Sequence, residues 1–95
     1  MPHCYIIHST KLDRFYIGSS ELDAIDRLEL HLSKYYGNQK FTSRADDWEI
    51  YLVINCSSIS QARKVEQHIK QMKSKRYILN LKKYPEIINK LLAKY

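Results

Sequence analysis

The sequence predicts an α/β domain in which a small three-stranded antiparallel sheet is flanked by helices, in the order ββαβαα. Three observations predict this class. Two short β-prone runs near the N-terminus are separated by a turn, apolar residues then recur at helical spacing, and a third apolar run precedes two more segments of helical spacing. With 95 residues, we expect one domain covering residues 1–95.

The first two predicted strands form a hairpin. Residues 5–8 and 14–18 are rich in aromatic and β-branched residues, and residues 10–13 between them have the composition of a turn. Side chains alternate along a strand, so Tyr5 and Tyr16 can point to the same face of the sheet. For an isolated pair of strand tyrosines, the simplest interpretation is cross-strand packing.

A helix is predicted next, over residues 22–36, and Gly37 with Asn38 ends it. Its apolar stripe consists of Ile25, Leu28, Leu32 and Tyr35. Residues 39–47 are polar and read as a loop.

Residues 48–54 form the strongest predicted strand, apolar enough to suggest the centre of the sheet. Ser58 and Gln61 fit a capping box that opens a helix. Pro85 suits the first turn of a last helix, which continues to Leu92. The helix that begins after Ser58 has its apolar positions at Ala62, Val65, Ile69 and Met72.

Composition excludes several classes of protein. No apolar run approaches the roughly 18 residues of a membrane span, and the N-terminus lacks the pattern of a signal peptide. Cys4 and Cys56 have no spacing typical of a zinc site or a disulfide framework. We therefore expect free thiols, a cytoplasmic location and no membrane partner.

The net charge of +6 is unevenly distributed. Residues 1–59 hold six Lys/Arg against eight Asp/Glu, whereas residues 60–95 hold ten Lys/Arg against only Glu66 and Glu86. A basic C-terminal third favours a polyanionic partner such as nucleic acid. A solvated face that serves solubility explains the charge alone equally well.

Several short motifs occur in a fixed order. Cys4-Tyr5-Ile6 is followed by Tyr16-Ile17-Gly18, then by Arg27 and His31, by Lys40-Phe41-Thr42, by Trp48 and by Glu66. In this order and spacing the chain resembles the GIY-YIG endonuclease superfamily, in particular small stand-alone members related to the N-terminal domain of the excision-repair endonuclease. The resemblance covers residues 4–80. The chain departs from the pattern at His3, which stands where the first triplet has glycine, and in a YIG-to-arginine spacing one residue longer than usual.

The resemblance implies a metal-dependent endonuclease that cuts nucleic acid, with DNA favoured over RNA, and leaves 5′-phosphate and 3′-hydroxyl ends. Tyr5 and Tyr16 would then activate or position the attacking water. Because a free phenol titrates near pH 10, the one that acts as base needs a nearby cation. The sequence does not say which tyrosine that is.

Arg27 and His31 lie one helical turn apart, so they share a face of the predicted helix. By resemblance, Arg27 would contact the phosphate and His31 would donate to it or carry a proton. On physical grounds alone, a salt bridge from Arg27 to Asp23 and an ordinary surface histidine are the competing interpretations.

Glu66 is the expected ligand of Mg²⁺ or Mn²⁺, since magnesium needs only one or two protein carboxylates. A plain ion pair with Lys70, four residues later, is the alternative. Asn80 falls where family members carry a supporting asparagine. The expected contacts with the nucleic-acid backbone are Lys40, Thr42, Arg44, Lys70 and Lys73.

Three functions therefore remain open: an active nuclease, a nucleic-acid-binding module without turnover, and a domain whose basic helices bind an acidic protein. The residue types at positions 5, 16, 27 and 66 favour the nuclease.

Overall fold

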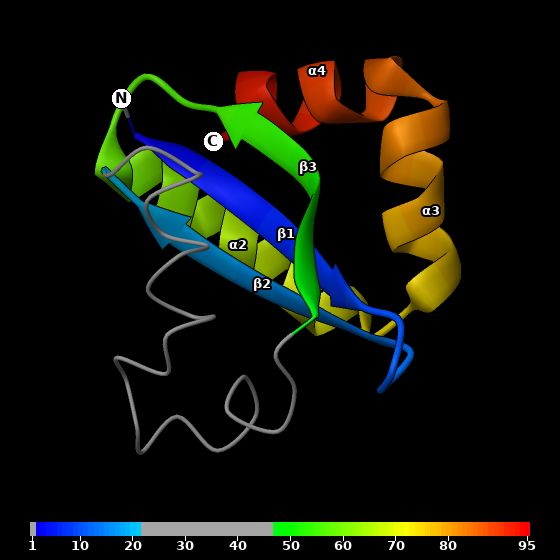
Figure 1. The fold of residues 1–95 in the computed structure, drawn as a ribbon. Helices are drawn as coiled ribbons and strands as arrows, with labels where there is room; N and C mark the ends of the chain where they lie inside the picture. Colours follow the sequence, from blue (N-terminus) through cyan, green and yellow to red (C-terminus); the bar gives the residue numbers. More distant parts are fainter. Residues whose placement is uncertain (1, 22–46) are drawn as a thin grey trace.

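The computed structural model describes residues 2–21 and 47–95. Its sheet contains β1 (His3–Ser9), β2 (Arg14–Ser20) and β3 (Trp48–Asn55), all antiparallel to their neighbours and in the order β2-β1-β3 (Figure 1). The α/β class with a three-stranded antiparallel sheet is thereby confirmed. The predicted helix over residues 22–36 and the loop after it lie outside the described residues, apart from Asp47.

The hairpin between β1 and β2 turns at residues 10–13, as predicted. Asp13 adopts the left-handed conformation with φ 50°, which aspartate tolerates better than most residues. Asp47, just before β3, stabilises this turn by hydrogen bonds. Its carboxylate accepts hydrogen bonds from Ser9 Oγ at 2.6 Å and from the backbone N–H of Lys11 at 2.9 Å.

The prediction that residues 48–54 form the central strand is wrong. β1 lies in the centre and is buried along almost its whole length, whereas β3 is an edge strand with exposed residues. The register between β1 and β3 shifts between Ile6 and Ile7, as expected of a bulge, and bulges are common at sheet edges.

Helix α2 (Ile59–Met72) begins as its sequence predicts. The Ser58 side chain accepts a hydrogen bond from the Gln61 backbone N–H at 3.1 Å. The Gln61 side chain reaches back one residue further than in a standard capping box and accepts the Ser57 N–H at 2.8 Å. In Figure 1, α2 runs behind the sheet.

Two further helices follow, α3 (Lys75–Lys83) and α4 (Pro85–Lys94). The last helix was predicted, with Pro85 in its first turn; α3 was not. Met72, expected in the buried stripe of α2, is 45% exposed. The helix ends there because Lys73 turns left-handed, with φ 49° and ψ 37°, and leads the chain toward α3.

The two faces of the sheet carry separate apolar clusters. On one face, Cys4 and Ile6 of β1 pack with the buried residues of the helices, among them Val65 and Ile69 of α2. On the opposite face lies a smaller cluster of Tyr5, Ile7 and Trp48, against which Tyr16 packs. The alternation of side chains along β1 therefore separates the tyrosines from the helix layer.

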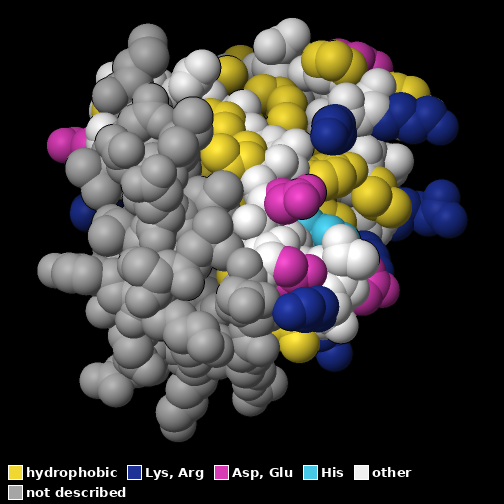
Figure 2. Space-filling view, in the orientation of Figure 1, with side chains coloured by type: hydrophobic (Ala, Val, Ile, Leu, Met, Phe, Trp, Pro, Cys, Tyr) yellow, Lys and Arg dark blue, Asp and Glu magenta, His cyan; other side chains and the backbone are white. Residues whose placement is uncertain are grey.

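Positive charge gathers on the helical side of the molecule. In Figure 2, Lys and Arg side chains are most frequent on the side of the view where α3 lies. Within the described ranges, no helix combines the length and the apolar character that crossing a membrane requires.

Candidate functional site

Tyr5 and Tyr16 share one face of the sheet, as their alternation predicts. Tyr5 pairs with Gly18 across the hairpin and Tyr16 pairs with Ile7, which puts the two tyrosines diagonally opposite each other. Their ring centroids lie 6.4 Å apart, with the planes tilted by 36°. Tyr5 is only 2% exposed, whereas Tyr16 is half-buried, so Tyr16 is the more accessible of the two phenols.

The phenol ring of Tyr5 lies directly across β2 at Gly18. A Cβ atom placed on Gly18 would lie 2.5 Å from Cζ and 2.9 Å from Cε1 of Tyr5, and it would also collide with the hydroxyl oxygen. Real Cβ atoms do not approach other atoms this closely, so any side chain at position 18 would push the phenol away. Gly18 is therefore needed for the position of Tyr5.

Glu66 approaches from the other face of the sheet, on helix α2. Its side chain is 14% exposed, and both carboxylate oxygens are engaged. Ser19 Oγ on β2 donates to Oε1 at 2.6 Å, and Lys70 Nζ donates to Oε2 at 2.6 Å. Short hydrogen bonds to an ionised acceptor fix the orientation of the carboxylate.

The two halves meet at the edge of the sheet. Gly18 and Ser19 are consecutive residues of β2, an edge strand, and their Cα–Cβ directions point to opposite faces. The Tyr5 phenol lies on Gly18, and Ser19 holds Glu66, so the phenol and the carboxylate flank the same two residues of one strand. This stretch of the β2 edge is the candidate site.

The chemistry of the site fits a hard divalent cation. Among residues 2–21 and 47–95, no three His, Cys, Asp or Glu side chains cluster in a way that could hold a metal. A single carboxylate is nevertheless sufficient for magnesium when water and substrate phosphate fill the other positions. The Lys70 ammonium lies beside Oε2, so an ion bound there would take the place of that ammonium.

Cys4 lies on the same face of β1 as the α2 layer but is not a candidate ligand. Burial raises the pKa of its thiol far above the ordinary value, and the negative charge of Glu66 raises it further. A hard cation such as Mg²⁺ takes oxygen ligands, so the Cys4 sulfur is a poor ligand for it.

The other predicted site residues are placed as follows. Lys70 contacts Glu66, and Lys73 is exposed at the end of α2, seven residues after Glu66. Five predicted residues lie outside the described part of the chain: Arg27, His31, Lys40, Thr42 and Arg44.

Asn80 lies in α3, and the described structure does not bring it to Glu66 or to the tyrosines. Its backbone carbonyl accepts the Tyr84 N–H at 2.7 Å, and no hydrogen bond joins its side chain to Glu66, Tyr5 or Tyr16 among the described residues. Two residues later, Lys82 lies 4.5 Å over the ring of Tyr51, on the far strand β3. A supporting role of Asn80 stays a prediction.

Ser19 is the site residue that the sequence did not reveal. It follows the Tyr-Ile-Gly triplet and looks like an ordinary strand serine. Only the packing of α2 against the face that carries Ser19 brings it to Glu66, 47 residues away in the chain. Its position, two residues after Ile17 on the same face, was the one available signal.

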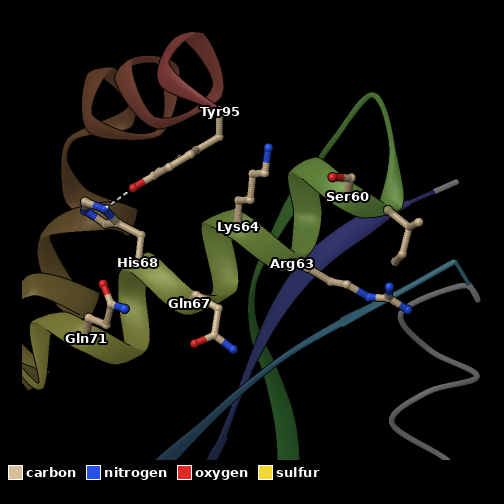
Figure 3. Close-up of a pocket in the computed structure, with 8 residues that line it drawn as sticks. Ser60, Arg63, Lys64, Gln67, His68, Gln71 and Tyr95 are labelled. Atoms are coloured by element: carbon tan, nitrogen blue, oxygen red, sulfur yellow. Dashed lines mark hydrogen bonds between the residues drawn. The ribbon is translucent and has the colours of Figure 1, made fainter.

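A separate hollow of about 420 Å³ lies along the outer side of α2, beside the C-terminal residue Tyr95 (Figure 3). Arg63, Lys64 and His68 line it, and His68 Nδ1 is hydrogen-bonded to Tyr95 Oη at 3.0 Å. None of Tyr5, Tyr16 and Glu66 is among its lining residues. The hydrogen bond anchors the end of the chain on α2, and the hollow is not part of the candidate site.

Comparison with known proteins identifies the family of the chain. The family model of the GIY-YIG catalytic domain matches residues 1–81, most of the chain. No curated protein and no solved structure gives a significant match. The matched stretch includes both tyrosines, Gly18, Ser19 and Glu66, and its model implies nuclease activity on nucleic acid. The chain therefore belongs to the GIY-YIG superfamily of nuclease domains.

Proposed function

We propose that this protein is a metal-dependent endonuclease that hydrolyses phosphodiester bonds, with DNA favoured over RNA, and leaves 5′-phosphate and 3′-hydroxyl ends. The observation that carries the proposal is the meeting of the Tyr5 phenol and the Glu66 carboxylate at Gly18 and Ser19. On this proposal, the phenols and a metal-binding carboxylate lie on either side of one strand edge, and a phosphate bound at that edge would contact both.

Glu66 would hold Mg²⁺ or Mn²⁺, with Ser19 fixing the orientation of the carboxylate. When bound, the ion supplies positive charge that stabilises the negative charge developing on the phosphate and the leaving oxygen. Lys70, which now donates to Oε2, would release the carboxylate and contact the substrate instead.

The tyrosines divide the work on the attacking water. Tyr16 is the half-buried phenol, so we assign it the direct contact with the water and the transfer of its proton. Tyr5 is almost fully buried and fixed over Gly18, so we assign it a positioning role.

The remaining predicted contacts complete the proposal. Arg27 would donate to the phosphate oxygens as charge builds up, with His31 and Asn80 in supporting roles. Helices α2 and α3 carry seven Lys/Arg against Glu66 alone, with Lys73 between them, and this charge suits a polyanion. Along the nucleic-acid backbone we propose contacts from Lys40, Thr42, Arg44, Lys70 and Lys73.

The test is cleavage of end-labelled DNA and RNA, each single-stranded, duplex and branched, with Mg²⁺, with Mn²⁺ or with EDTA. We expect cutting that requires the metal and that disappears in Glu66→Ala. The matched control is Glu86→Ala, because Glu86 is an exposed carboxylate in the first turn of α4, outside the site. Equal cutting by wild type and Glu66→Ala would remove Glu66 from the mechanism.

One observation favours a second candidate function, a binding module without turnover. Both oxygens of Glu66 already have protein partners, Ser19 and Lys70, and an ion pair of this kind needs no metal. This alternative predicts salt-sensitive binding of nucleic acid, but no cutting of any substrate with either metal.

A further inference from the structure

A groove of about 370 Å³ lies between the edge strand β2 and the junction of α2 with α3. The partly exposed Phe15 and Ile17 of β2 form its apolar floor, and the almost fully buried Ile69 and Ile78 of the helices line it as well. Ile69 and Ile78 belong to the main core, so the helix side of the floor is firmly held. We call it the β2–α2–α3 groove.

The rim of this groove is basic. Arg14, Lys70, Lys73 and Lys75 line it, against Asp13 as the single acidic residue of the described lining. Asp13 is already engaged, by Lys75 Nζ at 2.8 Å and by His8 Nε2 at 3.4 Å, and these contacts lower the pKa of its carboxyl group. Arg14 and Lys73 form no ion pair with any residue in the described part of the chain. Their charges are therefore available to an anionic ligand.

Lys73, on the rim, also has an uncommon backbone conformation. It occupies the left-handed position that ends α2, with φ 49° and ψ 37°. This position usually carries glycine, because a Cβ atom crowds the backbone in the left-handed conformation. A lysine at this point keeps a positive charge on the rim where α2 ends.

The groove is continuous with the candidate site. Lys70 lines the groove and also donates to Glu66 at 2.6 Å. Ile17 in the floor is the central residue of the Tyr-Ile-Gly triplet, next to Gly18. A strand whose phosphate reached Glu66 would therefore place its neighbouring nucleotide over this floor.

We propose that the β2–α2–α3 groove takes the base of one unpaired nucleotide next to the cleaved bond, with its flanking phosphates on the lysines. The inference rests on the proposed nuclease function and adds a substrate class, a locally single-stranded nucleic acid. An apolar floor stabilises a base only when that base has left its stack and its partner. The bases of a paired duplex stay stacked inside it, so only its phosphates would reach the groove. The apolar floor would then contribute nothing to the binding of a duplex.

The test measures binding in EDTA, so that it does not depend on catalysis. The probes are fluorescent single-stranded DNA oligonucleotides, a duplex of the same length, and a series of single strands in which one base at a time is removed to leave an abasic sugar. We expect the single strand to bind more tightly than the duplex. Removing one particular base should weaken binding at least about fivefold, the lower end of what stacking one base contributes.

Two variants separate the floor from the rim. In Ile17→Thr, which keeps a β-branched residue in β2, the sensitivity to the abasic position should disappear while the salt dependence stays. Lys73→Gly removes one phosphate contact and the left-handed strain, so it should bind more weakly, with a salt slope reduced by about 0.7, yet unfold at a higher temperature. The control is Lys90→Ala, an exposed lysine on α4 outside the groove, which should bind like the wild type.

Equal affinity for single strand and duplex, or the same affinity at every abasic position, would overturn the base-binding groove. If Lys73→Gly bound the single strand with wild-type affinity and salt slope, the rim would not contact the phosphates as proposed. These outcomes are distinct from failure of the nuclease, which appears as absence of metal-dependent cutting while the pattern of binding in EDTA is unchanged.

Discussion

At the scale of single residues, Gly18 and Ser19 link the two halves of the candidate site. The Tyr5 phenol lies against Gly18 on one face of the sheet, and Ser19 binds Glu66 on the other face. Position 18 has no room for a side chain, since the Tyr5 phenol lies where a Cβ would stand. We expect Gly18→Ala to destabilise the protein by about 1–3 kcal/mol, the usual cost of overpacking, and to lower the cleavage rate by displacing Tyr5. Urea unfolding and a single-turnover cleavage assay measure the two effects.

A double-mutant cycle shows whether the collision with Tyr5 is the cause. Tyr5→Leu removes the ring atoms that a Cβ at position 18 would meet, so Gly18→Ala should cost much less stability in the Tyr5→Leu background. If the two changes are simply additive in the free energy of unfolding, the loss in Gly18→Ala has another origin.

Ser19 fixes the Glu66 carboxylate through a hydrogen bond of 2.6 Å. Groups that orient a metal ligand typically contribute about 10–100-fold to metal affinity or activity. We therefore expect Ser19→Ala to weaken Mn²⁺ binding and to slow cleavage by this factor, with little change in the thermal unfolding temperature. Ser57→Ala, an exposed serine at the start of α2, is the control. Mn²⁺ titration followed by electron paramagnetic resonance measures the affinity directly, and unchanged affinity in Ser19→Ala would contradict the role.

At the scale of secondary-structure elements, Asp47 connects the start of β3 to the β1–β2 turn. Hydrogen bonds from Ser9 and from the Lys11 backbone lower the pKa of its carboxyl group below the ordinary 3.8. A lowered folded-state pKa stabilises the protein at pH values above 3.8, and this contribution is lost as the pH falls through the lowered value.

The stability gap between wild type and Asp47→Asn should therefore be present at about pH 7 and should shrink toward about pH 3. Urea unfolding at a series of pH values measures it. Asp13 shares the acid dependence, because Lys75 and His8 lower the pKa of its carboxyl as well. Both proteins contain Asp13, so a gap that stays constant down to about pH 3 would show that Asp47 does not stabilise the hairpin through its charge.

Most of the strands and helices follow from the sequence because they depend on local signals. Alternation and β-branched residues predict the hairpin, and Ser58 with Gln61 predicts the start of α2. The position of β3 at the edge was not predictable, because strand order depends on pairing partners and not on how apolar a run is. β1 lies in the centre although it is no more apolar than β3.

Helix α3 was missed because its apolar stripe is short. Only Ile78 and Leu81 are buried, within a segment dominated by basic and polar residues. A local signal was present at Ser74, whose side chain accepts the Tyr77 N–H at 3.1 Å and caps the helix. Tyr84 both ends α3 and begins α4, so no loop residues mark the boundary.

For the site, the shared face of Tyr5 and Tyr16 was predictable from the period of a strand. The contact between Ser19 and Glu66 was not, because it requires knowing which face of the sheet α2 covers. Glu66 follows the buried Val65, at the edge of the apolar stripe of the helix, and this position predicts that its side chain is partly buried. The sequence gives no sign of its partner on the sheet.

At the scale of the whole molecule, the proposed reaction uses groups on both faces of a thin sheet. The phenols lie on the face with Trp48, and the carboxylate comes from the helix layer on the opposite face. On the proposed mechanism, they would serve one phosphate because β2 is an edge strand and because Gly18 lets the Tyr5 phenol lie across it. On the same proposal, the basic helices α2 and α3 would supply the surface along which the polyanion binds.

Single-turnover cleavage by wild type, Tyr16→Phe, Glu66→Gln and the double variant tests this claim most directly. Each single change should slow cleavage by about 100-fold or more, and the double variant should be little slower than the worse single one, as for groups that act on one reacting centre. Binding of the substrate in EDTA should stay close to wild type in all of them. Wild-type rates in Tyr16→Phe, with a loss only in Glu66→Gln, would contradict a site shared by the two faces.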